Sequence, residues 1–155
     1  MNKTATEFRV MTKKDLDDVL SIEKDAFPTP WTRSLFHQEL DLSFSRHYVL
    51  IRIDPDGQKE MIGYIVFWII HDEVQLQRIA VKKSARVQGI GSLLLEEMIS
   101  ICGREAVRSG FLEVRSGNIE AQMLYQKFGF KVIGIRKRYY TDTQEDALVM
   151  GFEIS

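Results

Sequence analysis

A glycine-containing turn between two apolar runs constrains the fold of this chain more than any other feature. The turn, Arg86–Gly91, follows a strand-like run at Val74–Val81 and precedes a helix-like run at Ser92–Cys102. Because Gly89 and Gly91 have no Cβ, a ligand can approach the backbone closely there. A turn of this kind at the start of a helix presents backbone N–H groups at the positive end of the helix dipole, an arrangement that binds phosphate or pyrophosphate.

The glycines alone leave two interpretations open, which are a diphosphate site and a tight strand-to-helix turn without a ligand. The spacing is not G-x-G-x-x-G with an acidic residue at the distance expected for a ribose contact. It is also not G-x-x-x-x-G-K-[ST]. A dinucleotide-binding fold and a P-loop are therefore both disfavoured.

Bulk composition predicts a single globular domain over residues 1–155, since 45% of the residues are hydrophobic and 28% are charged. A net charge of -1 gives no general attraction to nucleic acid or to an anionic membrane, so neither is expected as a partner. The N-terminus lacks the apolar segment of a secretory signal, and the longest apolar run, Ile62–Ile70, is too short to span a membrane. We therefore expect a cytoplasmic protein.

The spacing and surroundings of the cysteine and the histidines indicate neither a nucleophile nor a metal site. The one cysteine, Cys102, lies in an apolar run and is expected to be a buried free thiol rather than a nucleophile. The three histidines, His37, His47 and His71, have no metal-ligand spacing. No metal site is expected.

Apolar periodicity and turn residues predict the element order β-α-α-β-β-β-α-β-α-β-β. The predicted strands are Phe8–Met11, His47–Ile53, Met61–Ile70, Val74–Val81, Phe111–Arg115, Lys131–Tyr140 and Ala147–Ile154. The predicted helices are one opened by Thr12 and ended by Pro28, one capped by Thr32, one from about Ile90 to before Gly110, and one at Ile119–Phe128 capped by Asn118. This order predicts an α/β (α+β) fold with a mixed, mostly antiparallel sheet and helices on both faces.

The turn and the segments around it resemble the GCN5-related N-acetyltransferase (GNAT) superfamily. Arg86-Val87-Gln88-Gly89-Ile90-Gly91 matches the [QR]-x-x-G-x-[GA] acetyl-CoA loop of that family, and Leu76–Val81 is similar to the strand before it. The segments that follow in the family's order are Leu112-Glu113-Val114-Arg115, Asn118, Leu124-Tyr125 and Phe128-Gly129-Phe130. Arg138-Tyr139-Tyr140 followed by Glu145-Asp146-Ala147 resembles the RimI-type ribosomal-protein-alanine N-acetyltransferase branch.

This resemblance implies a single N-acetyltransferase domain over residues 1–155, with acetyl-CoA as co-substrate and no metal. It implies that the strands Val74–Val81 and Phe111–Arg115 splay apart around the pantetheine arm of the cofactor. The residues it assigns to the cofactor are Ile79, Ala80, Val81, Arg86, Val87, Gln88, Gly89, Ile90, Gly91, Ser92 and Asn118. The RimI branch often has a second basic residue where this chain has Val87, a departure that removes a phosphate contact and leaves the backbone groups in place.

Two residues could carry the chemistry, because acetyl transfer needs a base for the amine and can use an acid for the leaving thiolate. Strand alternation alone puts Glu113 on a solvated face, whereas the resemblance implies that it is the general base. A helical Tyr125 is commonly a packed aromatic residue, whereas the resemblance implies that its hydroxyl is the general acid. Asn118 can combine helix capping with a cofactor contact.

The expected substrate is a protein N-terminal peptide. The run that contains Tyr139 and Tyr140 is typical of an exposed strand end, but the resemblance implies that both tyrosines line a peptide groove. It predicts acetylation of an N-terminal α-amine, with the alanine of a small-subunit ribosomal protein as the expected target. A small-molecule amine (polyamine or antibiotic) N-acetyltransferase and a non-catalytic acyl-CoA-binding module are the alternatives. Glu23 interrupts the apolar stripe of the first helix and stays open, either as a rim residue or facing the substrate amine.

Overall fold

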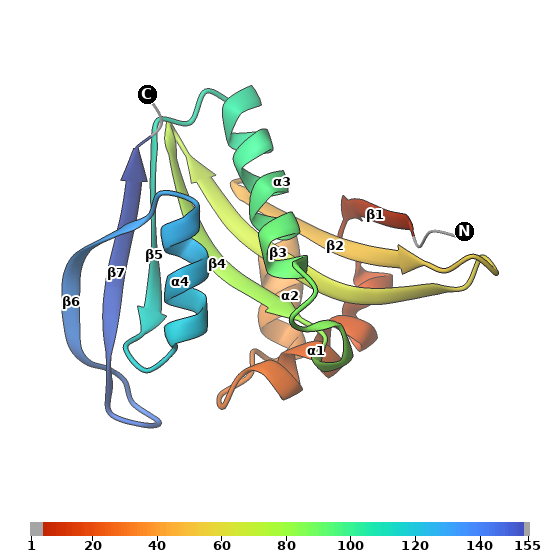
Figure 1. Ribbon diagram of the computed structural model, residues 1–155, viewed down its shortest axis with the longest axis horizontal. Coiled ribbons are helices and arrows are strands. Elements are labelled where there is room, and N and C mark those ends of the chain that lie inside the picture. Colours follow the sequence, from red (N-terminus) through yellow and green to blue (C-terminus); the bar gives the residue numbers. More distant parts are fainter. Residues whose placement is uncertain (1–4, 154–155) are drawn as a thin grey trace. The chain divides into compact units, whose positions relative to one another are not determined.

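The structure is a computed structural model and describes residues 5–153 (Figure 1). Over these residues seven strands form a mixed sheet in the order β1-β2-β3-β4-β5-β7-β6, accompanied by four α-helices. The strands are β1 (Ala5–Val10), β2 (Ser45–Ile53), β3 (Lys59–Ile70), β4 (Glu73–Val81), β5 (Ser109–Arg115), β6 (Lys131–Tyr140) and β7 (Glu145–Glu153). The helices are α1 (Leu16–Ala26), α2 (Arg33–Leu40), α3 (Ile90–Arg104) and α4 (Ile119–Lys127), with 3-10 turns η1 (Lys13–Asp15) and η2 (Lys83–Ala85).

The predicted element order is confirmed, and the differences lie at element ends. Thr12 opens the single turn η1 before α1 begins, with the Asp15 carboxylate accepting the Thr12 backbone N–H at 2.8 Å. The Thr32 hydroxyl accepts the Leu35 N–H at 3.2 Å, as expected of the cap of α2. The first strand begins at Ala5 rather than Phe8. The last strand is described as far as Glu153, and Ile154, where it was predicted to end, lies outside the described residues.

The pairing of the strands gives the mixed sheet that the element order predicts. β4 and β5 run parallel, with Glu73–Gln75 paired to Ser109–Phe111. The pairs β1–β2, β5–β7 and β6–β7 are antiparallel. The splay of β4 from β5 beyond this register stays a prediction.

The chain divides into two compact units, and each is described by itself. The first consists of the residues up to Phe67 together with Arg78–Leu94, and the second of Trp68–Gln77 together with the residues from Leu95 onward. β3, β4 and α3 each contribute residues to both units.

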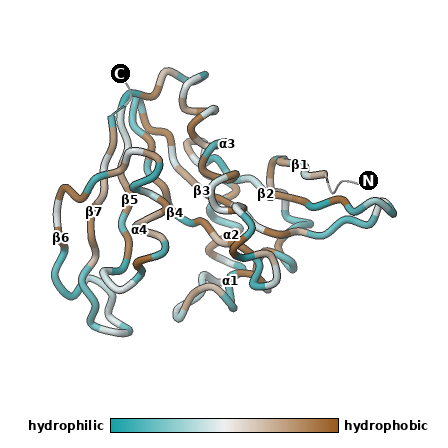
Figure 2. The backbone as a smooth tube through the Cα atoms, in the orientation of Figure 1, coloured by the Kyte–Doolittle hydropathy of each residue, from teal (hydrophilic) through white to brown (hydrophobic). Residues whose placement is uncertain are grey.

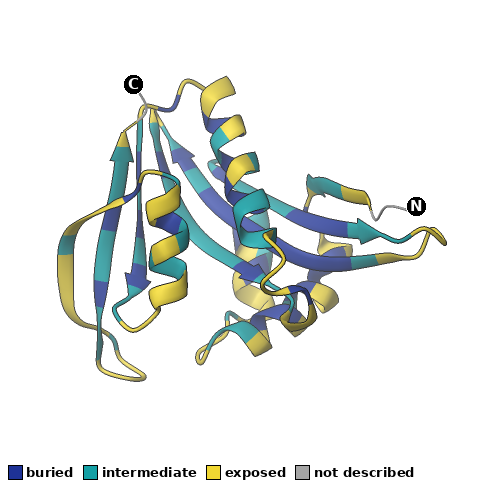
Figure 3. Cartoon of the chain, in the orientation of Figure 1, coloured by how far each residue is buried: buried dark blue, intermediate teal, exposed yellow. Residues whose placement is uncertain are grey.

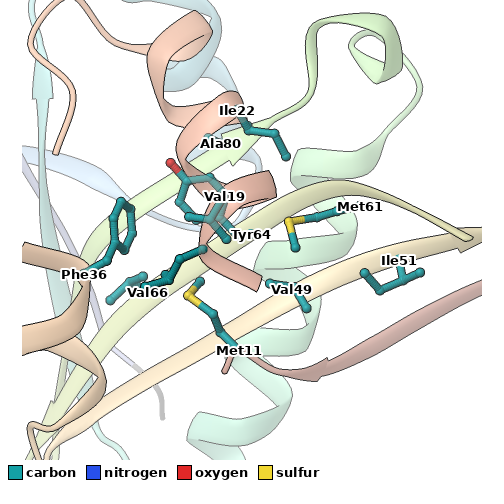
Figure 4. Close-up of a cluster of buried hydrophobic side chains, with 11 residues drawn as sticks. Met11, Val19, Ile22, Phe36, Val49, Ile51, Met61, Tyr64, Val66 and Ala80 are labelled. Carbon is teal, nitrogen blue, oxygen red and sulfur yellow. The ribbon is translucent and has the colours of Figure 1, made fainter. Parts of the chain in front are cut away.

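In the first unit, helices lie on both faces of the strands. One face carries the hydrophobic cluster of Figure 4, in which α1 and α2 pack on the strands through Leu16, Val19, Ile22, Phe36, Val49, Ile51, Met61, Tyr64, Val66 and Ala80, with Met11 beside them. On the other face the first turns of α3 cover β3, because a Cβ added to Gly63 would lie 3.2 Å from the Leu94 side chain and 3.5 Å from that of Ile90.

In the second unit, α4 covers one face of β5 and β7. Tyr125 of α4 packs edge-on against Phe130, whose ring lies 4.4 Å from that of Phe152. Phe152 lies opposite Gly110 in the β5–β7 register, so it shares a face with the buried side chains of Leu112 and Val114. Glu113, between these two residues, therefore points to the opposite face.

Candidate active site

The glycine turn, Arg86–Gly91, has a strained backbone in the first unit. Gly89 has a φ of 77°, which glycine adopts without steric cost, and a Cβ added there would meet open space. Val87 has a φ of 62°, a rare conformation for a β-branched residue, and its side chain is fully exposed. Strain of this kind clusters at ligand-binding loops, so the backbone supports the functional interpretation of the turn.

Side chains fasten the turn to its surroundings. Arg86 Nε donates to the Val81 carbonyl at 3.3 Å. Gln88 accepts from Arg52 Nη1 at 3.1 Å and donates to the Ser84 carbonyl at 3.4 Å. The Leu93 N–H donates to the Gly89 carbonyl at 3.1 Å and so begins the hydrogen-bond ladder of α3. Arg86 and Gln88, which were predicted to contact the cofactor, thus also hold the turn in shape.

Basic residues gather around the glycine turn. Glu60 lies 2.7 Å from Lys82 Nζ and 3.0 Å from Arg52 Nη2, and these two donors, Lys82 foremost, hold the pKa of Glu60 below its usual range. Lys83 and Arg86 add two more positive charges in the adjoining segment. The excess of positive charge favours an anionic ligand at the turn.

The end of β4 presents backbone away from β3. A Cβ on Gly63 of β3 would lie 2.9 Å from the Ala80 carbonyl oxygen, so the Ala80 backbone faces β3. Backbone groups of successive strand residues point to opposite sides, so those of Ile79 and Val81 face away from β3. Ile79, Ala80 and Val81 of β4 are all predicted to contact the cofactor. Of these three, only Ile79 and Val81 have backbone groups that face away from β3 and can pair with a ligand.

Glu113, in the second unit, is engaged by two residues of β6. Its carboxylate lies 3.3 Å from Arg136 Nε, and its side chain keeps 21% of its exposure. The centre of the Tyr139 ring lies 5.5 Å from Arg136 Cζ, and the neighbouring Glu113 carboxylate is the main reason why the pKa of Tyr139 lies above its usual value. Glu113, Arg136 and Tyr139 form what we call the Glu113 cluster. A carboxylate paired with a guanidinium is oriented by it, so the solvated face expected from alternation is only a partial description.

Tyr125 lies on the buried side of α4, in the hydrophobic interior. Its side chain is buried, with the ring centroid 6.0 Å from that of Phe130. Burial, and then the nearby Tyr140, raise the pKa of Tyr125 above its ordinary value. The phenol therefore stays protonated and can donate a proton. Because α4 covers the face opposite Glu113, the candidate acid and the candidate base lie on opposite faces of β5.

The tyrosine pair and Asn118 are also in the second unit. The rings of Tyr139 and Tyr140 meet edge-to-face with centroids 5.2 Å apart. The Arg115 guanidinium lies 4.1 Å above the Tyr140 ring and is held by Asp142 at 2.8 Å. Asn118 accepts the Ala121 N–H at 3.2 Å, which confirms that it caps α4.

Glu23 has a structural role that the sequence left undecided. It is fully buried and accepts hydrogen bonds from the Trp31 backbone N–H at 2.8 Å, from Arg78 Nε at 3.0 Å and from the Tyr64 hydroxyl. A buried residue with these partners is not a rim residue. A charge inside an apolar helical stripe, with an arginine on a later apolar strand, is the signal that could have indicated a buried ion pair.

The remaining observations concern Cys102, metal ligands and membrane-spanning helices. Burial raises the pKa of the Cys102 thiol to about 11, as expected of an inert thiol. Among residues 5–153, no group of three or more His, Cys, Asp or Glu side chains is arranged to hold a metal ion. None of the described helices has the length and apolar character needed to span a membrane.

Comparison with known proteins places this geometry in context. The model of the acetyltransferase (GNAT) family matches residues 16–130. A Bacillus subtilis protein, provisionally named [ribosomal protein bS18]-alanine N-acetyltransferase, is 40% identical over 153 residues, which is 99% of each chain. The crystal structure of the ribosomal-protein-S18-alanine N-acetyltransferase from Escherichia coli is 30% identical, with a TM-score of 0.86 over 97% of this chain and 95% of that chain.

One further solved structure shares the fold. A GNAT family acetyltransferase from Elizabethkingia anophelis with acetyl-CoA bound superposes with a TM-score of 0.74 over 96% of this chain and 98% of that chain. At 21% identity this likeness concerns the fold.

Proposed function

Because this chain belongs to the acetyltransferase (GNAT) family, we propose that it transfers the acetyl group of acetyl-CoA to a protein N-terminal α-amine, with the N-terminal alanine of a ribosomal protein as substrate. The observation that carries the proposal is the geometry of the Glu113 cluster, because it joins the candidate base to the tyrosine pair assigned to the peptide. Arg136 Nε lies 3.3 Å from the Glu113 carboxylate, and Arg136 Cζ lies 5.5 Å from the centre of the Tyr139 ring. A ribosomal-protein substrate also favours a cytoplasmic enzyme. We further assign residues 1–155 to one N-acetyltransferase domain.

The glycine turn supports acetyl-CoA as co-substrate. The left-handed Val87 and Gly89 shape the turn, and Lys82, Lys83 and Arg86 add positive charge around it. Backbone N–H groups at the start of a helix suit a pyrophosphate. The chain's departure from the branch at Val87 leaves these backbone groups intact.

The side chains of the second unit divide the proton chemistry between them. Acetyl-CoA supplies an acetyl group activated as a thioester. Glu113 accepts the proton that the amine must lose before its nitrogen bonds to the acetyl carbon, directly or through a water molecule. Tyr125 donates a proton to the sulfur as the carbon–sulfur bond breaks. Its raised pKa keeps it protonated for this step.

The single carboxylate favours an α-amine over a lysine side chain. An α-amino group has a pKa of about 7.7–8.0, whereas a lysine amine has a pKa of about 10.4. A larger share of the α-amine is therefore unprotonated near neutral pH, and one glutamate suffices for the rest. A small first residue such as alanine would lie nearest the thioester, with the following residues along Tyr139 and Tyr140.

The proposal is tested by incubating the protein with acetyl-CoA and a peptide that begins with alanine and carries an internal lysine. Mass spectrometry should locate the acetyl group on the α-amine, and a peptide with a blocked α-amine should gain none. Label found only on the internal lysine would overturn the assignment to an α-amine. Label found only on polyamines offered in parallel would overturn the proposal in favour of the small-molecule alternative.

A further inference from the structure

β6 contains an irregular segment that includes Tyr139 and ends directly before Tyr140. Arg136 lies opposite Ala147 and Tyr140 lies opposite Glu145, so Lys137–Tyr139 oppose Asp146 alone. This is a bulge with more residues on one strand than on its partner. Most of β6 is exposed, as Figure 3 shows, and Figure 2 shows the strand passing from hydrophobic to hydrophilic along its length. The bulge therefore lies outside the hydrophobic core.

The bulge decides which residues of β6 face Glu113. In the sheet register Arg136 opposes Ala147, and Ala147 opposes Arg115, which shares a face with Glu113. In a regular strand Tyr139, three residues after Arg136, would point to the other face. Tyr139 nevertheless lies beside Arg136, whose Cζ is 5.5 Å from the centre of the Tyr139 ring and whose Nε is 3.3 Å from the Glu113 carboxylate. The extra residues thus turn Tyr139 onto the face of Glu113.

The carboxylate of Asp146 holds this bulge in place. Arg138, inside the bulge, has a φ of 50°, and its backbone N–H donates to Asp146 Oδ1 at 2.9 Å. Lys137 Nζ lies 3.4 Å from Asp146 Oδ2. The hydrogen bond from Arg138, followed by the charge of Lys137, holds the pKa of Asp146 below its usual range. A non-glycine residue with a positive φ needs such a contact to offset its strain.

We propose that Asp146 is a positioning residue for acetyl transfer: by accepting the Arg138 N–H it fixes the bulge that directs the Tyr139 hydroxyl to Glu113. Asp146 acts only through Tyr139 and touches none of the reacting groups. The inference rests on the proposed function, since it assigns Glu113 and Tyr139 to the reaction.

Three variants test whether Asp146 acts by accepting the Arg138 N–H. Asp146→Ala removes the acceptor, and we expect kcat/KM for an alanine-starting peptide to fall about 10- to 100-fold, because small misplacements of a reacting group cost rates of that order. Asp146→Asn keeps an oxygen for the Arg138 N–H and should retain most activity. Lys137→Met removes only the ion pair and should resemble wild type. Acetyl-CoA affinity, measured by calorimetry, should be unchanged in all three.

Rescue and coupling distinguish positioning from general damage to the fold. Arg138→Gly should restore much of the activity of Asp146→Ala, because glycine adopts a positive φ without a stabilising hydrogen bond. Adding Asp146→Ala to Tyr139→Phe should cost little beyond Tyr139→Phe alone, since Asp146 is proposed to act only through the Tyr139 hydroxyl, which Tyr139→Phe already removes. Wild-type kcat/KM in Asp146→Ala would overturn the inference. A loss of activity in Asp146→Ala would also overturn it if Arg138→Gly did not restore activity and if the loss were just as large when Tyr139 was already phenylalanine.

The same experiments separate this inference from the proposed function. If Glu113→Gln and Tyr139→Phe both transfer acetyl groups at the wild-type rate, the proposed function of these residues fails. If both are impaired while Asp146→Ala is not, the proposed function stands and the role of Asp146 is wrong.

Discussion

The glycine turn and the Glu113 cluster reach their geometry by different routes. The turn depends on residues close together in sequence, since Gly89, Val87 and Arg86 set its backbone and its attachment to β4. The Glu113 cluster depends on sheet register, since Glu113 is on β5 whereas Arg136 and Tyr139 reach it from β6, across β7. A local motif can be recognised in a sequence, whereas a cluster assembled by strand order cannot.

This difference predicts how each region responds to mutation. Changes in the glycine turn should alter cofactor affinity with little effect on the chemical step. Changes in the Glu113 cluster should alter the chemical step with little effect on cofactor affinity. Substitutions in each region test whether cofactor binding and the chemical step separate in this way.

The largest effect is expected for Glu113→Gln, which keeps the size of the side chain and removes the base. Turnover on an alanine-starting peptide should fall by about 100- to 10,000-fold, the usual contribution of a general base. The loss should be greatest at low pH, where more of the substrate amine is protonated. Steady-state rates across pH measure it, with acetyl-CoA binding by calorimetry as the control. A variant with wild-type rates at every pH would remove Glu113 from the mechanism.

Tyr125→Phe should lower turnover about 100-fold by removing the proton donor while keeping the buried ring. Because the pKa of Tyr125 is raised above its ordinary value of 10.0, the wild-type phenol stays protonated as the pH rises toward 10. The wild-type rate should therefore show no decline from phenol ionisation between pH 8 and about 10. Equal turnover for the variant and the wild type would leave Tyr125 with a packing role only.

Much of the fold was predictable because it depends on local signals. The Thr32 and Asn118 caps and the alternation along β5 each act within a few residues, and the structure has all of them. The family assignment was also predictable, since its motifs lie in short segments such as the glycine turn. The residues that a local pattern could assign are those whose roles depend on their immediate neighbours.

Every contact that could not be predicted from the sequence joins segments that are far apart in the chain. Arg136 precedes the tyrosine pair in a run whose sequence is typical of an exposed strand end, and its contact with Glu113 depends on the β5-β7-β6 order and register. Glu23 was undecided because its partners Tyr64 and Arg78 lie 41 and 55 residues away. No periodicity in a single segment carries such information.

Gly91→Val tests the glycine turn alone. A branched side chain there would occupy the space that a pyrophosphate needs, so acetyl-CoA affinity should fall about 10-fold or more, as expected when several hydrogen bonds to a charged group are lost. Gly103→Ala, later in the same helix, is the matched control, because a Cβ there meets open space. Calorimetry reports affinity and circular dichroism confirms folding. Unchanged affinity in Gly91→Val would place the pyrophosphate elsewhere.

Substitutions of Asn118 should have the smallest effects. They distinguish a capping role from a cofactor contact, because Asn118 lies in the same unit as the Glu113 cluster but is assigned to the cofactor. Asn118→Ala removes the cap of α4 and should destabilise the protein by about 1 kcal/mol, measured by thermal unfolding without ligand. Asn118→Asp keeps a capping oxygen of equal strength and should preserve that stability.

The aspartate variant also adds a negative charge where a phosphate or pantetheine contact is proposed. If Asn118 touches the cofactor, acetyl-CoA should bind Asn118→Asp several-fold more weakly, since an unfavourable charge contact replaces a hydrogen bond, and added salt should reduce the difference. Wild-type affinity in Asn118→Asp would show that capping is the whole role of Asn118. A loss of affinity with full stability would instead show that Asn118 contacts the cofactor in addition to capping α4.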